Sequence, residues 1–430
     1  MKNRIKQYLL AASMCVGLTA CSDFFEPIPG VQFGLDETFA SKQRTEEYLN
    51  NVYSYVREVT DAIHPNTYGG IFTEASLDGA NRWNKTYAEW TNGSFNSASA
   101  QASEYFSKYY QAIAKASTFI QNVDKCTEAA ASTRGKWKSE ARALRAYYYF
   151  ELLRLYGPIP LIGEDPIPLD ASLEELIKER NSVDECVNFI ATELQSAIDS
   201  GDLLQRAGKA NLGRMDVATC MALKAKLYLY WASPLFNGNT DQASVKNKDG
   251  KQLFPQTEDH SKWTQARDAY ERFMTFATGQ GYKLTEVYTN GKLDPYASCR
   301  AAGEFFTTTW EAVDELIFVK LRDLYDYTYW VCPKFTDFQD TDVTGGGGYY
   351  TTQETVDLFF TKDGLTIEED PGYDKFEGIP GTNNFTSGRY YDPNNPSRLY
   401  FDADKSKVLK QWKDREPRFY VNITYSGSIW

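Results

Sequence analysis

Two short stretches of the chain combine flat aromatic rings with acidic, amide and guanidinium side chains. An aromatic ring packs against the apolar C–H face of a sugar ring, while neighbouring polar side chains can bind the hydroxyl groups. One stretch runs over residues 78–90 and the other over residues 322–330, where tyrosines alternate with acids. Each single ring could instead be a packing residue. The candidates for ligand binding are Asp78, Arg82, Trp83, Trp90, Tyr325, Tyr329 and Trp330.

No stretch of the sequence has the pattern of a catalytic or metal centre. No spacing singles out two of the 58 acids as a glycosidase pair, and no Ser or Cys lies in the setting of an activated nucleophile. Only 2 His and no Cys-X-X-Cys are available, which argues against zinc. Asp337, Asp340 and Asp342 lack calcium-loop spacing, which favours a solvated turn. We therefore predict no catalytic residue, no metal and no cofactor.

The N-terminus has the pattern of an export signal with a lipid attachment site. Lys2, Arg4 and Lys6 precede an apolar run from Tyr8 to Leu18 that is too short to span a bilayer as a permanent helix. Leu18-Thr19-Ala20-Cys21 then has the form of a lipobox. We predict that residues 1–20 are a signal peptide and that Cys21 carries the lipid, although a plain secretory signal is the alternative. The membrane would then be reached through this anchor only.

The composition describes an acidic, aromatic-rich protein. The formal net charge is −12, and no basic stripe is present to hold a phosphate backbone, so we predict no binding to nucleic acid. Aromatic residues make up 15% of the chain, including 30 Tyr and 9 Trp, which fits either a tyrosine-rich core or a carbohydrate-binding surface. Cys186 and Cys220 lie among apolar residues at helical spacing, which predicts small core residues.

The first part of the chain carries helical patterns. Apolar residues recur at three- and four-residue steps over residues 41–60, 100–124, 139–156, about 182–200 and about 215–232, and another such segment begins at Trp263. Gly157 and the prolines that follow it end the third of these segments. We predict a mainly α fold of tetratricopeptide-like helical pairs stacked into a solenoid, although the period is too irregular for a clean repeat array.

From about residue 279 the pattern changes to short β-rich runs and turns. The run Leu316–Leu321 predicts a buried strand, and the alternation of Phe419, Val421, Ile423 and Tyr425 predicts another. Trp231, Trp310 and Trp412 are predicted to be packing residues. We expect an irregular, loop-rich lobe that contains short β-strands.

Several blocks of sequence, in order, resemble the SusD/RagB family. They include Ser139 to Ile162 (SEARALRAYYYFELLRLYGPIPLI), Tyr109 to Ile113, Leu223 to Tyr230, Glu315 to Phe318, Thr351 to Phe359 and Asp414 to Tyr420. Each block alone is weak, but their order and spacing are similar to those of the family over nearly the whole mature chain. The resemblance implies domains at residues 21–278 (helical) and 279–430 (C-terminal lobe).

The family resemblance also implies a function without catalysis. Such proteins are outer-membrane lipoproteins of Bacteroidetes, exposed at the cell surface, that capture oligosaccharides and pass them to a TonB-dependent transporter. The two aromatic stretches lie in regions where the family often places glycan-stacking rings. Because family members usually continue past the last block, the resemblance also implies a truncated C-terminal lobe.

Two alternatives remain open at the level of sequence. The same scaffold serves peptide or glycopeptide uptake in some relatives, and the aromatic stretches do not exclude such ligands. A surface glycoside hydrolase is the other alternative, because the chain is rich in carboxylates.

Overall fold

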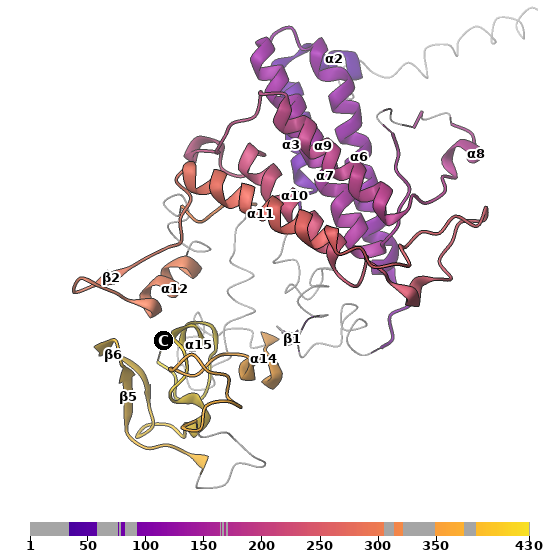
Figure 1. Cartoon of the computed structure of the whole chain (residues 1–430). Helices are drawn as coiled ribbons and strands as arrows, with labels where there is room; N and C mark the ends of the chain where they lie inside the picture. Colours follow the sequence, from indigo (N-terminus) through magenta and orange to yellow (C-terminus); the bar gives the residue numbers. More distant parts are fainter. Residues whose placement is uncertain are drawn as a thin grey trace, which may run out of the picture.

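The computed structural model describes residues 34–57, 76, 79–81, 93–163, 165, 167–168, 171–304, 314–320, 349–373 and 384–429. Two bodies are seen in Figure 1, a larger helical one and a smaller mixed one. We call the first the helical frame. Its α-helices are α2 (Leu35–Ala40), α3 (Lys42–Ser54), α6 (Ala100–Asn122), α7 (Ala131–Tyr156), α8 (Leu173–Leu176), α9 (Val183–Asp199), α10 (Val217–Ala232) and α11 (Ser261–Gly279). Short 3₁₀ turns occur at η5 (Val123–Lys125), η6 (Lys209–Asn211) and η7 (Thr240–Gln242).

Helices that follow one another in the chain pack against each other through the frame. The packed pairs are α6 with α7, α7 with α9, α9 with α10, and α10 with α11. This order confirms the predicted mainly α fold of stacked helical pairs. Helices α6, α9 and α10 lie within two or three residues of their predicted bounds, whereas α3 ends earlier than predicted, at Ser54.

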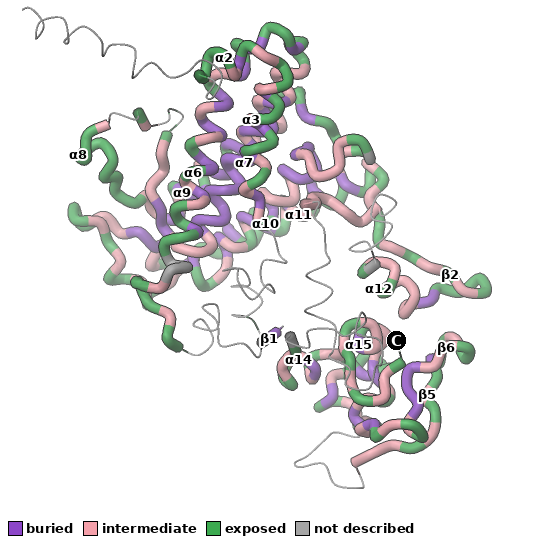
Figure 2. Tube along the Cα trace, turned by 180° about the vertical axis from the view of Figure 1, so that it is seen from behind, coloured by how far each residue is buried: buried purple, intermediate pink, exposed green. Residues whose placement is uncertain are grey.

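Helix α7 lies at the centre of the frame. Every residue from 143 to 153 is buried, although the sequence predicts only one apolar face. Ala143 and Ala146 are buried, as their small size allows when neighbouring helices come close. Buried residues concentrate along the helices of the frame in Figure 2. Cys186 and Cys220 belong to this core, which confirms their predicted packing role.

The second body, which we call the C-terminal lobe, comprises the described residues 284–304, 351–373 and 384–429. It contains α12 (Pro295–Glu304), α14 (Gln353–Asp357), α15 (Pro417–Asn422) and the 3₁₀ turn η11 (Lys410–Trp412). Its strands are β2 (Tyr288–Thr289), β3 (Lys292–Leu293), β5 (Arg389–Asp392) and β6 (Asn395–Asp402), paired as two antiparallel hairpins. Aromatic rings fill its core, where Tyr400 stacks on Tyr420 at 3.9 Å between ring centroids.

Two predicted strands are wrong. Residues 314–320 form no strand and are only half-buried, because they pack on the frame instead of pairing with a sheet. Residues 417–422 form helix α15, because Pro417 stands in its first turn after an extended Glu416, an arrangement that favours a helix start. The ring of Phe419 is buried and stacks on Trp412 at 5.7 Å.

The predicted packing roles of two tryptophans are confirmed. Trp231 is 9% exposed, and Trp412 packs against the core of the C-terminal lobe. Trp310 and the last residue of the predicted run 316–321 lie outside the described residues. None of the described helices combines the length and apolar content needed to cross a bilayer.

Candidate functional site

All of the predicted ligand-binding residues lie outside the described part of the chain. This holds for Asp78, Arg82, Trp83 and Trp90 in the first stretch and for Tyr325, Tyr329 and Trp330 in the second. Cys21, the predicted lipidation site, also lies outside it. The described residues on either side of the two stretches nevertheless show how the fold connects them.

A two-residue antiparallel pairing joins the first stretch to the chain that follows the second. Strand β1 (Ala80–Asn81) lies between Asp78 and Arg82 in the sequence, and it pairs with β4 (Tyr349–Tyr350). In this pairing Ala80 is opposite Tyr350, and Asn81 is opposite Tyr349. This pairing joins segments more than 250 residues apart in sequence.

A second junction lies where the chain leaves the helical frame. The Lys320 ammonium donates hydrogen bonds to the carbonyl oxygens of Ser54 at 3.2 Å and Val56 at 2.5 Å. The continuously described chain after α3 ends at residue 57, and Lys320 is the last described residue before the second stretch. These two points of the described chain lie next to each other, close to the end of α3.

We call residues 314–320 the anchor segment, because side chains of the frame hold it at several points. Arg206 donates to Asp314 at 2.9 Å, and the Thr219 hydroxyl donates to the Ile317 carbonyl at 3.2 Å. Gly213 has φ +82°, and a Cβ there would lie 2.8 Å from the Val319 carbonyl oxygen. Only glycine allows this close approach without a shift of the anchor segment.

A cavity of about 270 Å³ lies beside the anchor segment. It is lined by Asn50, Tyr53, Ser54, Val56, Leu212, Gly213, Arg214, Phe318, Val319 and Lys320. The Tyr53 hydroxyl donates to Glu140 at 2.9 Å and accepts from the Met215 amide at 2.8 Å, and Arg214 forms an ion pair with Glu140 at 3.0 Å. The wall of this cavity is therefore fixed by a closed set of polar contacts.

Burial controls protonation in this wall. It raises the pKa of the Tyr53 phenol well above its ordinary value, so the phenol stays neutral. Burial also raises the pKa of Glu140, while the Arg214 guanidinium acts in the opposite direction. Tyr53 and Arg214 line the cavity and can contact a ligand there, while Glu140 holds both of them in place.

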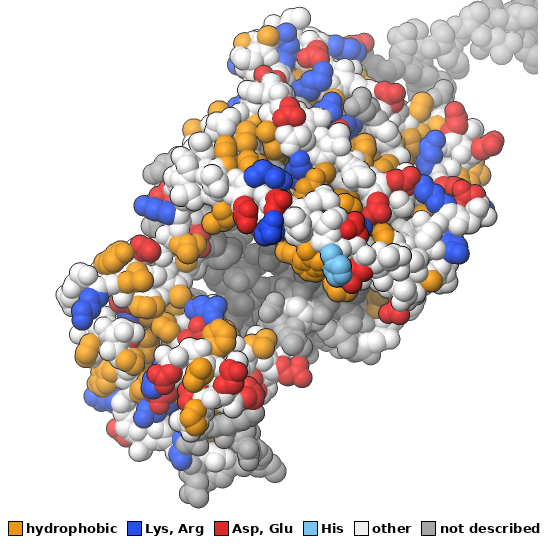
Figure 3. Space-filling model, in the orientation of Figure 1, with side chains coloured by type: hydrophobic (Ala, Val, Ile, Leu, Met, Phe, Trp, Pro, Cys, Tyr) orange, Lys and Arg blue, Asp and Glu red, His pale blue; other side chains and the backbone are white. Residues whose placement is uncertain are grey.

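The described residues contain no group of three or more His, Cys, Asp or Glu side chains placed to hold a metal ion. Acidic and basic side chains are interspersed over the face shown in Figure 3, with no large region of one sign among the coloured residues. Uncharged ligands would meet little electrostatic barrier on such a surface.

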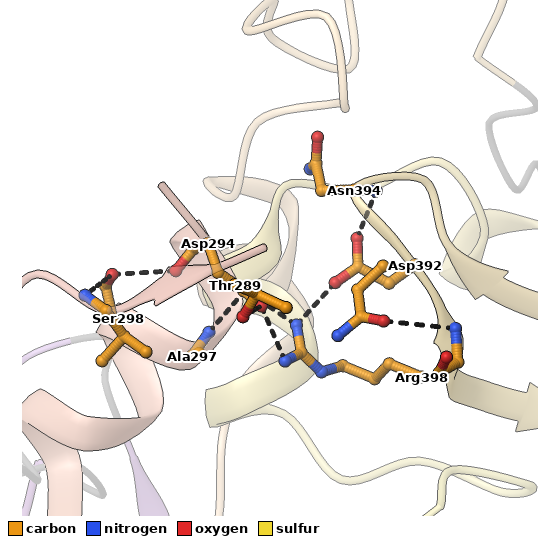
Figure 4. A network of polar contacts seen from close by, with 10 residues as sticks. Thr289, Asp294, Ala297, Ser298, Asp392, Asn394 and Arg398 are labelled. Carbon is orange, nitrogen blue, oxygen red and sulfur yellow. Dashed lines mark hydrogen bonds and ion pairs between the residues drawn. The ribbon is translucent and has the colours of Figure 1, made fainter. Parts of the chain in front are cut away.

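An ion network in the C-terminal lobe was not predicted from the sequence. Arg398 of β6 donates to both carboxylate oxygens of Asp294, at 2.8 and 2.9 Å, and to Asp392 at 2.7 Å (Figure 4). It thereby joins the start of α12 to the β5–β6 hairpin. No local signal could reveal this contact, because Asp294 and Arg398 are 104 residues apart.

The described elements define a mainly helical scaffold of stacked pairs with a separate loop-built region. Two family models match it: a SusD-like model described as "Starch-binding associating with outer membrane" over residues 32–229, and the SusD family model over residues 315–430. Together the matches span most of the chain. The chain belongs to the SusD/RagB family.

Individual relatives agree with this assignment. A SusD-like protein from Bacteroides ovatus is 27% identical over 175 residues, which cover 39% of this chain and 30% of that protein. The solved structure of BT4246 has a TM-score of 0.69 at 24% identity, covering 89% of this chain and 64% of that one. A SusD-like protein from Bacteroides fragilis gives a TM-score of 0.59 at 19% identity, covering 91% and 62%. The chain thus spans less than two thirds of the length of these relatives.

Proposed function

We propose that this protein is a surface lipoprotein that binds glycans and delivers them to a TonB-dependent outer-membrane transporter. The pairing of β1 with β4 is the observation that carries the glycan site, because it brings the chain beside Trp83 into contact with the segment that follows Trp330. Membership of the SusD/RagB family supports the ligand class. Trp83, Trp90, Tyr325, Tyr329 and Trp330 would offer stacking faces, with Asp78 and Arg82 binding hydroxyl groups.

The junctions at the frame support a preformed site. Lys320 holds the end of the anchor segment against the chain just after α3, and the β1–β4 pairing holds a second pair of segments together. A site held at two points loses less conformational freedom when a ligand binds, which favours affinity.

The ligand class is tested by affinity electrophoresis of the full chain across a panel of neutral polysaccharides, followed by calorimetry on any that retard it. Trp83→Ala and Trp330→Ala are each expected to weaken binding by about tenfold or more, as for the loss of a central aromatic contact. Trp263→Ala is the matched control, because Trp263 is 42% exposed on α11 and outside both stretches.

Three outcomes would count against this proposal. Retardation by no polysaccharide would reject the ligand class, and equal losses for Trp263→Ala would reject the site. New reducing ends after incubation with a bound glycan would indicate a glycoside hydrolase.

The lipid attachment at Cys21 and the transporter partner need separate tests. Radiolabelled palmitate should be incorporated in cells that express the full chain and should be lost with Cys21→Ala, which would leave the protein out of the outer-membrane fraction. Affinity purification from outer membranes should recover a TonB-dependent barrel. A barrel-free preparation from cells that express a TonB-dependent transporter together with this protein would reject the partner.

A further inference from the structure

The frame has a second cavity, and none of the residues that line it belongs to either aromatic stretch. Its volume is about 440 Å³, within the range of small-molecule sites. It lies between α6, the segment that follows α7, and the end of α8. Its lining residues are Phe106, Tyr110, Ile113, Ala114, Ser117, Pro160, Ile162, Ile167, Leu176, Ile177 and Lys178. Helix α8 stands apart from α6 and α9 in Figures 1 and 2.

Hydrogen bonds hold the floor of this cavity in place. The Tyr110 hydroxyl donates to the Pro160 carbonyl at 2.7 Å. The Tyr149 hydroxyl donates to the Ile162 carbonyl at 2.9 Å and accepts from the Ile162 amide at 3.0 Å. The ring of Phe106 lies 4.6 Å from that of Tyr110. The apolar space is therefore preformed, which lowers the entropic cost of filling it.

One buried hydroxyl interrupts the apolar lining. Ser117 is 2% exposed, and its oxygen accepts a hydrogen bond from the fully buried Arg145 guanidinium at 3.1 Å. Among the described residues no acceptor is found for the Ser117 hydroxyl proton. A hydroxyl that accepts from a cation is polarised as a donor, and a buried donor without an acceptor is costly. A ligand oxygen would satisfy it.

One cation lies at the opposite wall. Lys178 is the only charged residue among those that line the cavity, and it is exposed. It forms no ion pair or hydrogen bond with any other described residue. The carboxylate of nearby Glu175 accepts from the Ser172 amide at 2.7 Å and the Ser172 hydroxyl at 2.9 Å, and the Lys178 charge adds to these hydrogen bonds in lowering the pKa of Glu175.

We propose that this cavity binds an amphipathic monocarboxylate, with its apolar body against α6 and its carboxylate at Lys178. The charge of Lys178 complements the carboxylate, and the aliphatic and aromatic lining matches the apolar body. An oxygen on the apolar body would accept from Ser117. Two sources share the carboxylate and the apolar body, namely aromatic acids, whose ring oxygen can also accept from Ser117, and aliphatic acids, which lack that second contact.

The test is calorimetric titration of the full chain with ferulate, an aromatic acid, and with decanoate, an aliphatic one. We expect binding with a Kd below about 1 mM for at least one probe. Ala114→Phe fills the cavity from an exposed position on α6 and should weaken that binding by about tenfold or more. Gln111→Phe is the matched control, because Gln111 is exposed on α6 but does not line the cavity.

Two further variants separate the polar contacts. Lys178→Met should weaken the binding of both acids by about two- to fivefold and leave the binding of methyl ferulate unchanged. Lys405→Met is the control, because Lys405 is also an exposed lysine. Ser117→Ala should weaken the binding of ferulate but leave the binding of decanoate unchanged. Because Ser117 also contacts Arg145, the Tm of this variant is measured separately to detect any loss of stability. Binding of decanoate alone would assign the aliphatic source, and binding of ferulate alone the aromatic source.

The proposal is overturned if neither acid binds below about 1 mM, or if Ala114→Phe binds them as well as the Gln111→Phe control does. Equal binding of methyl ferulate and ferulate to the unaltered protein would overturn the carboxylate assignment at Lys178. None of these outcomes depends on glycan binding, which the same preparations can report through Trp83→Ala.

Discussion

The helical frame and the C-terminal lobe are stabilised in different ways. The frame has one continuous core of buried side chains that runs from Phe39 on α2 to Phe254 beyond α10. In its described part the lobe has a small buried cluster of Tyr400, Phe401 and Val408, around which partly buried aromatic rings stack, and Val356, Ile367 and Phe419 are buried outside that cluster. Its parts are joined by Arg398 between Asp294 and Asp392. Apolar burial therefore dominates in the frame, whereas the lobe depends more on rings and ion pairs.

This difference predicts where the molecule opens first. Burial of apolar area contributes roughly 25 cal/mol per Å² and responds little to salt or pH. Ion pairs respond to both. We expect amide hydrogen exchange to be slower in α7 and α9 than in the β5–β6 hairpin, because local opening follows local burial.

The largest effect is expected at the ion pair between Arg145 and Glu193, whose side chains are the least exposed of the ion pairs in the described part of the frame. The Arg145 guanidinium donates to Glu193 at 2.9 and 2.5 Å, and both side chains are almost fully buried. Glu193→Leu leaves this cation without its carboxylate and should lower the free energy of unfolding by about 3–5 kcal/mol, as measured by urea denaturation.

The double variant Arg145→Met with Glu193→Leu is the control for this prediction. It removes both charges, so most of the lost stability should return. An exposed ion pair contributes up to about 1 kcal/mol to the free energy of unfolding. If Glu193→Leu lowered the free energy of unfolding by no more than this, the frame would tolerate an unpaired buried charge.

Arg398→Met tests the corresponding contact in the lobe. It leaves Asp294 and Asp392, each 2% exposed, without their shared cation. We expect a loss of about 2–3 kcal/mol, concentrated in the hydrogen exchange of α12 and the β5–β6 hairpin. Arg389→Met is the matched control, because Arg389 pairs with Asp402 at 3.0 Å but its side chain is 53% exposed. Equal losses from the two variants would contradict the assigned role of Arg398.

The same contrast explains what the sequence could predict. Helices α6, α9 and α10 have amphipathic patterns of sixteen residues or more, so their positions follow from local periodicity. The all-round burial of α7 does not follow, because Arg145 is charged and is buried only through its partner on α9. Partners far apart in sequence leave no local signal.

The sequence-based strand prediction after Pro417, in the lobe, is wrong for a physical reason. The alternating residues after Pro417 fit a strand, but six residues there form a helix whose Phe419 packs on Trp412. Tertiary packing thus overrides a weak local pattern. For the candidate site, composition identified the two aromatic stretches. The pairing of Ala80 with Tyr350, which joins the first stretch to the chain that follows the second, could only come from the fold.

A smaller effect is expected where the frame holds the anchor segment. Gly213→Ala places a Cβ at φ +82° and 2.8 Å from the Val319 carbonyl oxygen. Gly250→Ala adds the same atom at φ +88° with nothing within 4 Å. Both variants incur the conformational cost, but only Gly213→Ala displaces the segment. We expect Gly213→Ala to lose about 1–2 kcal/mol more in thermal unfolding, with faster proteolysis near residues 314–320. Equal losses would mean that the segment moves freely.

The effect of acid should separate the two regions most finely. The Arg398 hydrogen bonds hold the pKa of Asp294 well below its usual range, so the folded lobe binds fewer protons than the unfolded chain below about pH 4. Its contribution is present above that pH and is lost as the pH falls. Burial raises the pKa of Glu140 in the frame, so the cost of its ionised form disappears as the pH falls.

Acid should therefore weaken the lobe before the frame, and hydrogen exchange between pH 3 and 6 measures each region separately. Asp294→Asn should flatten the pH dependence of the lobe below about pH 4 and leave that of the frame unchanged. Glu140→Gln is the matched change in the frame and should alter the pH dependence of stability only in the frame. If Asp294→Asn left the acid response of α12 and the β5–β6 hairpin as steep as before, a different carboxylate would have to control the stability of the lobe.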